Sequence, residues 1–383
     1  MILSLQTNSF GSYGGIPTYN RLVCRVLNDS NFRSVNRVLI AMDDPRPVES
    51  AAAFHPSLHM SAFGGRRAAF AKAALTMAAR EPIDVVLAGH VNYAPLCTLL
   101  KRLQPQLRYG VFIYGCEVWD RMPLLRKAAA QHADFLIAIS EYTKRQAVRS
   151  NNLLEERIFL LPNALEWTNG TVASPARRTP FSGIKLLSVG RLDSTEQRKG
   201  FDTVIESLPA VIERVPDVQY LIVGGGSDLE RHKQLASRVG VSDRVHFLGT
   251  VPEDLLHDCY KSCDVFVMPS AQEGFGFVYL EAMQYRKPIV AANRGGAPEV
   301  VQDGINGKLI DYGNKQQLAE TLIDLCLDPD TRRKLGDAGY QRLQQNFTFA
   351  HFKQKFMDIL RLKSHSHPVH EGVLPRESNS CAS

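Results

Sequence analysis

Long apolar runs are missing from this sequence of 383 residues. No segment approaches the eighteen or so uninterrupted apolar residues that a membrane-spanning helix needs, so we predict no transmembrane helix. The segment Met1–Thr7 lacks both the basic start and the long apolar stretch of a signal peptide. We therefore interpret it as a first β-strand.

Paired cysteines are also missing, because none of the seven cysteines forms a C-x-x-C motif. Cys259 and Cys263 are four residues apart, yet no set of histidine and cysteine partners completes a zinc site around them. We predict no metal site and no other cofactor. An odd number of scattered thiols without a secretory signal indicates a reducing compartment, which we expect to be the cytoplasm.

Acidic residues are outnumbered in one half of the chain only. Residues 1–165 carry 19 basic and 12 acidic side chains, whereas the remainder carries 26 and 27. A basic half beside a nearly neutral half suggests an anionic partner, which is either a phospholipid surface at the inner face of the membrane or a phosphate-carrying acceptor. An ordinary solvated surface is the alternative, because no run of basic residues is dense. We predict no nucleic-acid partner.

Short apolar runs alternate with longer helical patterns along the chain, which is typical of parallel sheets with crossover helices. The predicted strands are Met1–Leu5, Arg37–Ala41, Asp84–Ala88, Gly110–Tyr114, Phe135–Ile139 and Ile158–Leu161, then Lys185–Val189, Gln219–Val223, Val245–Leu248, Val265–Met268 and Pro288–Ala291. The segment 165–180 between the two series is rich in turn-forming residues and is predicted to be a linker. We therefore predict an α/β protein with two doubly wound Rossmann-like domains facing across a cleft.

The domain boundaries follow from these series. Residues 1–165 form the predicted N-terminal domain, and residues 182–348 form the predicted C-terminal domain. A closing helix over about 349–363 has apolar residues at helical spacing. Residues 364–383 are polar and aperiodic, and we predict that they are disordered.

A glycine-rich loop follows the first predicted strand. Glycines allow a tight turn and a close approach of the backbone, and the helix that follows offers free N–H groups to an anion. Gly14 and Gly15 are therefore candidates to lie against a phosphate. The spacing differs from a dinucleotide fingerprint and no acidic residue follows at the required distance, which disfavours NAD. Such loops also occur for purely steric reasons.

Two cations follow the first strand of the second half. Arg191 comes at the exit of an apolar strand, and Lys199 directly precedes the next helical pattern. A long cation at the end of a buried strand is costly unless it meets an anion. Arg191 offers a planar fork and Lys199 a point charge, and together they can neutralise a diphosphate without a metal. Two surface cations in salt bridges are the alternative.

Two further turns are placed to contact a nucleobase with backbone groups. One contains Gly225 and follows the strand Gln219–Val223, and the other ends at Val251. Neither turn is specific by itself.

The segment from Pro269 to Met283 contains two glutamates around the start of a helix near Gly276. Glu273 is predicted to lie in the loop before the helix, and Glu281 about a turn and a half inside it. The amides of the first turn are a natural phosphate seat. A loop carboxylate can accept hydrogen bonds from sugar hydroxyls, and a helical one from a ribose. A helix cap for Glu273 and an exposed helical acid for Glu281 are the alternatives. The donor-binding residues expected in this segment are Glu273, Gly274, Phe275, Gly276, Phe277, Val278 and Glu281.

These motifs make the sequence similar to glycosyltransferase family 4, the retaining enzymes of GT-B fold. In the second half the resemblance rests on Ser188–Leu192, Arg198–Asp202, Leu221–Gly226, Phe247–Gly249, Glu273–Gly276, Leu280–Met283, Gly295–Val301 and Asp303–Gly307. In the first half it rests on Gly14–Gly15, Ala138–Thr143 and Leu161–Asn163. The pair of glutamates separated by seven residues is the family's most specific mark.

The resemblance implies a role for each matching residue. Arg191 and Lys199 would bind the donor phosphates, Glu273 the donor sugar and Glu281 the ribose, while Gly15 would lie near the distal phosphate. It implies a retaining hexosyltransferase that uses a nucleotide-diphosphate sugar and a saccharide or lipid-linked acceptor, in polysaccharide or glycolipid synthesis. The N-terminal domain would then face the acceptor, and the closing helix would cross back onto it.

The sequence departs from the family's pattern in two places. The family often has His-Gly after the strand Gly110–Tyr114, but here Tyr114-Gly115 replaces it. His90, at the end of another predicted strand, is a candidate for the catalytic acceptor side, with a capping histidine as the alternative. Bulky residues, 284–287, also replace the small residues usual before Pro288.

Two other functions remain open at this point. A nucleotide-sugar epimerase would keep a donor site but needs an acid and base pair instead of an acceptor cleft. A catalytically silent GT-B partner subunit would keep the fold for assembly or membrane docking. Such partners usually lose a phosphate-binding cation or a glutamate, whereas this sequence has Arg191, Lys199, Glu273 and Glu281.

Overall fold

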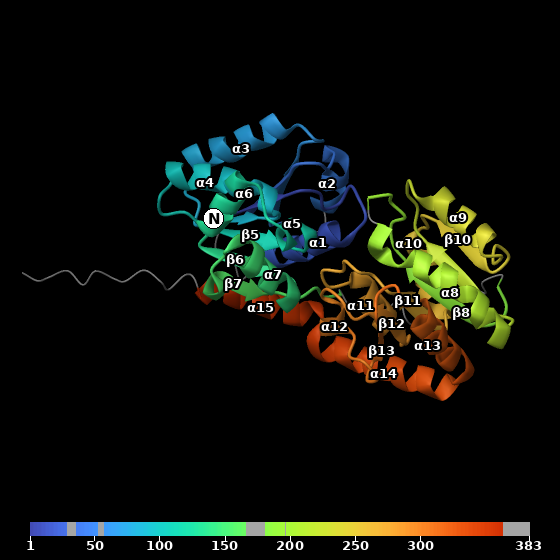
Figure 1. Cartoon of the computed structure of the whole chain (residues 1–383). Coiled ribbons are helices and arrows are strands. Elements are labelled where there is room, and N and C mark those ends of the chain that lie inside the picture. The colour runs from blue at the N-terminus through green and yellow to red at the C-terminus, as the bar shows by residue number, and fades with distance from the viewer. Residues whose placement is uncertain (29–35, 53–56, 166–180, 196, 363–383) are drawn as a thin grey trace, which may run out of the picture.

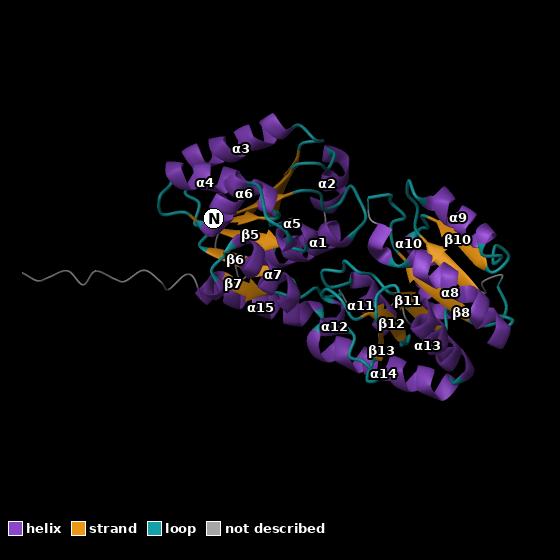
Figure 2. Ribbon diagram, in the orientation of Figure 1, coloured by secondary structure: helices purple, strands orange, loops and turns teal. Residues whose placement is uncertain are grey.

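The computed structural model describes residues 1–28, 36–52, 57–165, 181–195 and 197–362, and it shows two α/β domains (Figure 1). Each domain has one parallel sheet at its centre, with helices packed against it (Figure 2). The prediction of two Rossmann-like domains is therefore confirmed. The predicted linker and tail, 165–180 and 364–383, lie outside the described residues except for Leu165.

The first sheet has seven strands in the order β3-β2-β1-β4-β5-β6-β7. The strands are β1 (Ile2–Gln6), β2 (Asn36–Ile40), β3 (Leu58–Ala62), β4 (Val85–Ala88), β5 (Arg108–Ile113), β6 (Phe135–Ala138) and β7 (Ile158–Leu160). The helices are α1 (Gly15–Leu27), α2 (Pro45–Ala52), α3 (Arg67–Arg80), α4 (Ala94–Leu103), α5 (Cys116–Trp119), α6 (Leu124–Gln131) and α7 (Glu141–Asn151), with 3₁₀ turns η1 (Val91–Tyr93) and η2 (Glu155–Arg157).

The strands of the first sheet bury both faces, because successive side chains point to opposite sides. Val111 and Ile113 of β5 pack in a cluster with residues of α3, α4 and α6. Phe112 lies between them in sequence and points the other way, where its ring centroid is 5.6 Å from that of Tyr19 in α1. Two helical layers therefore cover this sheet.

The second sheet has six strands in the order β10-β9-β8-β11-β12-β13. The strands are β8 (Lys185–Val189), β9 (Gln219–Val223), β10 (Val245–Gly249), β11 (Val265–Met268), β12 (Ile289–Ala292) and β13 (Gly307–Ile310). The helices are α8 (Phe201–Arg214), α9 (Leu229–Arg238), α10 (Glu253–Ser262), α11 (Phe277–Gln284), α12 (Ala297–Val300), α13 (Lys315–Leu327), α14 (Pro329–Asn346) and α15 (Phe349–Leu362), with the 3₁₀ turn η3 (Gln197–Lys199).

Two strands, β3 and β13, are absent from the prediction. Both are edge strands, with a neighbour on one side only. In β3 the burial alternates, and in β13 only the first and last residues are buried. Neither segment therefore has the continuous apolar run that marks a central strand of a parallel sheet.

The last helix returns to the first domain. In α15 the ring of Phe352 is 5.2 Å from that of Tyr19, and the ring of Phe356 is 6.0 Å from that of Phe112. Two backbone hydrogen bonds link Leu165 to the start of this helix, one with Phe347 and one with Phe349. Figure 1 shows α15 along the first domain, next to α7 and β7.

Candidate active site between the two domains

Both sheets reverse their strand order at one point, and the candidate residues follow the strands at these points. In the first sheet the reversal lies between β1 and β4, and in the second between β8 and β11. A crevice forms at the carboxyl ends of such neighbouring strands, because the connections leave in opposite directions. The glycine loop follows β1, His90 follows β4, Arg191 follows β8 and Glu273 follows β11.

The loop that carries Glu273 is packed between the domains. A methyl group on Gly274 would lie 2.3 Å from the carbonyl oxygen of Tyr114 in the first domain. On the other side, a methyl group on Gly295 would lie 2.4 Å from the carbonyl oxygen of Glu273. The backbone of Gly296 also donates a 2.7 Å hydrogen bond to that oxygen. The absence of side chains at these glycines lets the loop reach the first domain.

Lys199 and Glu273 are brought together from different parts of the second domain. The Nζ atom of Lys199 is 3.4 Å from Oε2 of Glu273, and the two side chains are 23% and 15% exposed. The Cys116 thiol of the first domain lies close enough for both charges to act on its pKa, which burial raises. The pair therefore faces the first domain. Arg191 has an exposed side chain on the loop after β8. Hydrogen bonds from Thr195 lower the pKa of the neighbouring Asp193, and the charge of Arg191 adds to this.

The first turn of α11 faces the first turn of α1. Gly276 precedes α11 with φ 100°, and no side chain caps that helix. Gly14 precedes α1 with φ 137°, and no side chain caps that helix either. A methyl group on Gly15 would lie 3.7 Å from the Phe277 ring. Two helix N-termini, each with N–H groups lacking helical partners, are thus close across the domain boundary, which suits an anion.

The glycine loop is held by Asp43, which sequence reasoning missed. Its Oδ2 atom accepts hydrogen bonds from the backbone N–H groups of Ser9 and Phe10, at 2.8 and 2.6 Å. Asp43 comes shortly after β2, and no local motif links it to the loop. Arg21 of α1 donates a 2.7 Å hydrogen bond to the Ser9 carbonyl.

Glu281 has a tyrosine partner. The Tyr260 hydroxyl in α10 donates a 2.6 Å hydrogen bond to Oε2 of Glu281. Burial raises the pKa of Glu281, the Tyr260 hydrogen bond lowers it, and the charge of Glu253 raises it, with a net increase. Glu281 is thus neither a simple exposed acid nor part of the Lys199–Glu273 pair. The helical pattern of α10 gave no sign of the tyrosine contact.

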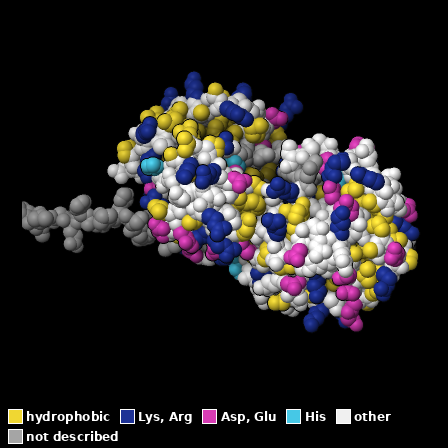
Figure 3. Space-filling model, in the orientation of Figure 1, with side chains coloured by type: hydrophobic (Ala, Val, Ile, Leu, Met, Phe, Trp, Pro, Cys, Tyr) yellow, Lys and Arg dark blue, Asp and Glu magenta, His cyan; other side chains and the backbone are white. Residues whose placement is uncertain are grey.

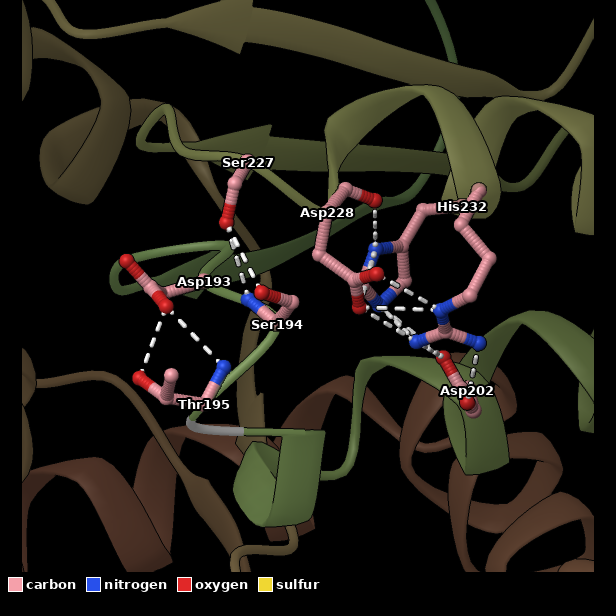
Figure 4. Close-up of polar contacts among 8 residues, drawn as sticks. Asp193, Ser194, Thr195, Asp202, Ser227, Asp228 and His232 are labelled. Atoms are coloured by element: carbon pink, nitrogen blue, oxygen red, sulfur yellow. Dashed lines mark hydrogen bonds and ion pairs between the residues drawn. The ribbon is translucent and has the colours of Figure 1, made fainter.

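The loop carrying Arg191 is tied to the neighbouring glycine turn. The backbone of Leu192 donates to the carbonyl of Gly225 at 3.0 Å, and that of Asp228 donates to the carbonyl of Leu192 at 2.8 Å. Figure 4 shows Ser194 bonded to Ser227, and Asp193 to Thr195.

A charged cluster fastens the same region to α8 and α9. Arg231 bonds to Asp202 at 2.8 Å and to Asp228 at 2.6 Å. His232 lies 2.9 Å from Asp202, and Figure 4 shows both beside Asp228. Asp202 stands three residues after Lys199, so the cluster holds the segment that presents this lysine.

The two glycine turns at the edge of the second sheet meet each other. The backbone of Gly224 donates a 2.8 Å hydrogen bond to the carbonyl of Gly249. A methyl group on Gly225 would lie 3.2 Å from the Thr250 hydroxyl. Val251, the next residue, is half-buried. The predicted base-contacting turns are therefore neighbours.

His90 caps a 3₁₀ turn and stacks on Tyr114. Its Nδ1 atom accepts a 3.2 Å hydrogen bond from the backbone of Asn92, as the capping alternative requires. Its ring is 6.4 Å from that of Tyr114, with the planes 28° apart. Tyr114 therefore connects His90 to the Glu273 loop, because its ring stacks on His90 and its carbonyl lies against Gly274. His90 lies on the first-domain side of this loop.

The charge of Glu117 also acts on His90. Burial lowers the pKa of His90, Glu117 raises it and Arg126 lowers it, with a net decrease. Glu117 accepts a 2.5 Å hydrogen bond from the backbone of Tyr114. Glu117 was visible in the motif that replaces His-Gly, but nothing in the sequence placed it beside His90.

Comparison with known proteins identifies the family. The family model described as glycosyl transferases group 1 matches residues 177–342. A GDP-mannose-dependent alpha-(1-6)-phosphatidylinositol monomannoside mannosyltransferase of Mycobacterium tuberculosis is 30% identical over 298 residues, which cover 74% of this chain and 77% of the relative. The enzyme of the same name from Mycolicibacterium smegmatis is 34% identical over 266 residues, covering 64% and 68%.

The fold is shared with solved structures at lower identity. HepE of Anabaena, in complex with UDP-glucose, superposes with a TM-score of 0.74 at 20% identity, over 94% of this chain and 99% of HepE. Sucrose-phosphate synthase of Thermosynechococcus elongatus gives a TM-score of 0.74 at 20% identity, over 96% and 99%. Taken with the relatives of similar sequence, these matches show that the chain belongs to the group 1 glycosyl transferases and is a glycosyltransferase of GT-B fold.

Proposed function

We propose that this enzyme transfers a hexose, with retention of anomeric configuration, from a nucleoside-diphosphate sugar to a hydroxyl of a saccharide or lipid-linked acceptor. The observation that carries the proposal is the Lys199–Glu273 pair, 3.4 Å apart on loops facing the first domain. The lysine can bind the phosphate and the glutamate can bind the sugar, so the pair can hold both sides of the bond that breaks.

The donor diphosphate binds between the domains in this proposal. Lys199 and Arg191 neutralise its charge, and the first-turn amides of α1 and α11 donate hydrogen bonds to its oxygens. Gly14, Gly15 and Gly276 allow the close approach, with Phe277 and Val278 supplying amides. These fixed positive groups stabilise the leaving diphosphate without a metal.

The rest of the donor lies along the second domain. Glu273 accepts hydrogen bonds from the sugar hydroxyls, and the backbone of Gly274 and Phe275 follows the sugar. Glu281 accepts from the ribose. The turns at Gly225 and Val251 contact the base, since they meet at the end of β9 and β10.

The chemical step takes place on one face of the sugar. The bond between the anomeric carbon and the leaving phosphate oxygen breaks, and the acceptor oxygen forms a bond to the same face. The acceptor proton passes to the departing phosphate, which leaves as the nucleoside diphosphate. Lys199 and Arg191 lower the barrier because negative charge grows on the leaving group.

His90 lies on the acceptor side in this proposal. Burial holds its pKa below the ordinary value, so its ring is neutral at neutral pH. Because Nδ1 accepts from the Asn92 backbone, Nε2 carries the hydrogen and can donate a hydrogen bond to the acceptor oxygen. Its stacking on Tyr114 fixes the plane of the ring. A hydrogen bond of this kind orients the acceptor oxygen toward the sugar.

Mannose from GDP-mannose is the donor that we propose to test first. Several relatives similar in sequence are named GDP-mannose-dependent mannosyltransferases of phosphatidylinositol monomannoside. We extend this to a lipid-linked acceptor, and hence to peripheral association with the cytoplasmic face of an anionic membrane. No helix in the described part of the chain is long and apolar enough to span a membrane.

Replacing either member of the central pair tests the donor site. We expect Glu273→Gln and Lys199→Ala each to lower kcat/KM for GDP-mannose by at least about a hundredfold, since each removes a charge-assisted contact in the transition state. The assay measures release of GDP from GDP-mannose with phosphatidylinositol mannoside as the acceptor. The same assay with UDP-glucose as the donor gives the comparison. Glu213→Gln and Lys334→Ala, both at exposed positions of the second domain, are the matched controls. Near-normal turnover in folded Glu273→Gln and Lys199→Ala proteins contradicts the proposal.

Chelation tests the role given to the protein's own cations. We expect EDTA to leave the rate unchanged, because Lys199, Arg191 and two helix N-termini balance the diphosphate charge. The rate before and after EDTA treatment, and again after added magnesium, is the measurement. A loss with EDTA that magnesium restores would assign phosphate neutralisation to a metal instead. The anomeric configuration of the product, read by NMR, tests retention separately.

A further inference from the structure

Three neighbouring helices of the first domain share one outer face. Helix α4 packs against α3 on one side and against α6 on the other. Their inner sides bury Phe70, Leu100 and Ala130 against the sheet. Figure 1 shows the three helices together on the side of the first domain away from α15. Their outer sides form what we call the α3-α4-α6 face.

The α3-α4-α6 face has no acidic residue in any of its helices. The three helices contain seven basic residues, Arg67, Lys72, Arg80, Lys101, Arg102, Arg126 and Lys127. Of these, Lys101 is paired with Asp134 on the loop before β6. Helix α14, of similar exposure on the second domain, mixes both signs of charge. The basic excess of the first 165 residues is therefore concentrated where it can meet one extended anion.

Exposed leucines lie among these cations. Leu124 and Leu125, at the start of α6, are 86% and 71% exposed. Leu99 and Leu103 of α4 are 46% and 55% exposed. Figure 3 shows hydrophobic side chains gathered over α3 and α4, with Lys and Arg at their edge. Leucines beside lysines and arginines are the composition of a surface that enters the boundary between lipid headgroups and acyl chains.

The outer stripe of α3 combines cations with apolar residues. Lys72 and Arg80 lie along this stripe with Ala73 and Met77 between them, and Glu81 follows at the end of the helix. Two cations over a small apolar floor suit a phosphate attached to a hydrocarbon chain.

The α6 end of this face borders the acceptor side of the active site. Helix α6 packs against the turn η1, which directly follows His90. The charge of Arg126 also reaches His90, because it helps to lower the pKa of that ring. An acceptor held in a lipid surface at Leu124 and Leu125 would thus present its headgroup beside His90.

We propose that the α3-α4-α6 face docks on an anionic phospholipid bilayer, with Leu124 and Leu125 inserted at its surface. This inference uses one part of the proposed function, which is that the acceptor is linked to a lipid. A nucleic acid fits the face poorly, because single strands bind through aromatic stacking and the one aromatic residue of these helices, Phe70, is 3% exposed. Docking keeps the acceptor within reach of the donor while the enzyme stays on the surface.

Vesicle flotation of the full chain tests the docking directly. The wild type is expected to float with vesicles of phosphatidylcholine and phosphatidylglycerol, and much less with phosphatidylcholine alone or in high salt. L124S/L125S is expected to lose most of the bound fraction, whereas the control L255S/L327S, at exposed leucines of the second domain, is expected to keep it. K72E/R80E is expected to lose binding, and R333E/K334E on α14 to keep it. Circular dichroism of each variant verifies folding.

The outcomes separate this inference from the proposed function. Equal flotation of wild type and L124S/L125S, or no flotation of the wild type on anionic vesicles, overturns the docking. Binding of RNA or self-association through this face, lost in K72E/R80E, assigns the face to that partner and also overturns it. GDP-mannose binding measured by calorimetry reports on the donor site alone. Its absence in the wild type contradicts the proposed donor but leaves the flotation result standing.

Discussion

The two glutamates around α11 differ in their surroundings although only seven residues separate them. Glu273 is paired with a lysine at 3.4 Å. Glu281 is half-buried beside a tyrosine, and burial raises its pKa above the ordinary value. Glu281 therefore takes up a proton more readily than an ordinary glutamate as the pH falls.

We expect acid to weaken donor binding through Glu281, which the proposed function places on the ribose. As pH falls, Glu281 takes up a proton above the ordinary glutamate pKa of 4.5, and the ribose loses a charged acceptor. In Tyr260→Phe the hydrogen bond that lowers this pKa is gone, so we expect the loss to begin at higher pH. Donor affinity by calorimetry across mildly acidic pH measures it. Tyr312→Phe, at a partly exposed site, is the control. An identical pH profile in Tyr260→Phe and wild type would show that Glu281 does not bind the ribose.

At the scale of elements, the loop that carries Arg191 and Lys199 depends on α8 and α9 for its position. Asp202 belongs to the first turn of α8, and Arg231 and His232 to α9. Burial raises the pKa of Asp202, but hydrogen bonds from His232 and Arg231 outweigh it, and the pKa falls to about 2. The contribution of Asp202 to folding is therefore present above its ordinary pKa of 3.8 and is lost as pH falls toward 2.

Removing Arg231 tests this connection. We expect Arg231→Ala to lower the free energy of unfolding by about 1 kcal/mol at neutral pH, a modest value because the side chains of Arg231 and Asp202 are each 36% exposed, although Asp228 is buried. Without its guanidinium the pKa of Asp202 rises, so the acid loss of stability begins at higher pH than in the wild type. Urea unfolding at neutral and acidic pH measures both effects. Arg333→Ala, which breaks an ion pair whose side chains are 73% and 80% exposed, should change neither.

The elements that end at the active site were predictable, and several of their contacts were not. Strands β8 and β11 are central, with Leu186, Leu187, Phe266 and Val267 fully buried, so the sequence placed Arg191 and Glu273 at the carboxyl edge of this sheet. Edge strand β13 left no such mark. Tyr260 and Asp43 escaped prediction because their partners are distant in sequence, and a contact of that kind depends on how helices pack and not on spacing. The roles of the individual donor residues stay predictions.

At the scale of the whole molecule, two contacts set how the domains meet. Gly274 touches the Tyr114 carbonyl, and Glu299 of α12 accepts hydrogen bonds from the backbone of Glu141 and Tyr142 at 2.8 and 2.7 Å. The carboxylate of Glu299 thus lies at the N-terminus of α7, where the helix dipole favours a negative charge. Both contacts across the domain boundary therefore involve backbone groups of the first domain, the Tyr114 carbonyl and the amides of Glu141 and Tyr142.

A single methyl group at this boundary should separate the domains. In Gly274→Ala the new methyl would lie 2.3 Å from the Tyr114 carbonyl, so either the loop or the first domain must move. We expect kcat to fall at least about tenfold, because a small displacement at the reacting atoms is costly. GDP release measures this. Gly240→Ala, where φ is 75° and a methyl meets nothing within 4 Å, is the control for a glycine substitution that strains the second domain without touching the first. Full activity in Gly274→Ala would show that this contact is not needed for turnover.

Helix α15 has a consequence for how the chain is made. Its Phe352 and Phe356 pack against Tyr19 and Phe112, residues synthesised more than two hundred positions earlier. The first domain therefore emerges from the ribosome with one apolar surface uncovered, and that surface can close only after α15 has followed. We expect the packing of the first domain to be completed after the second domain has been made.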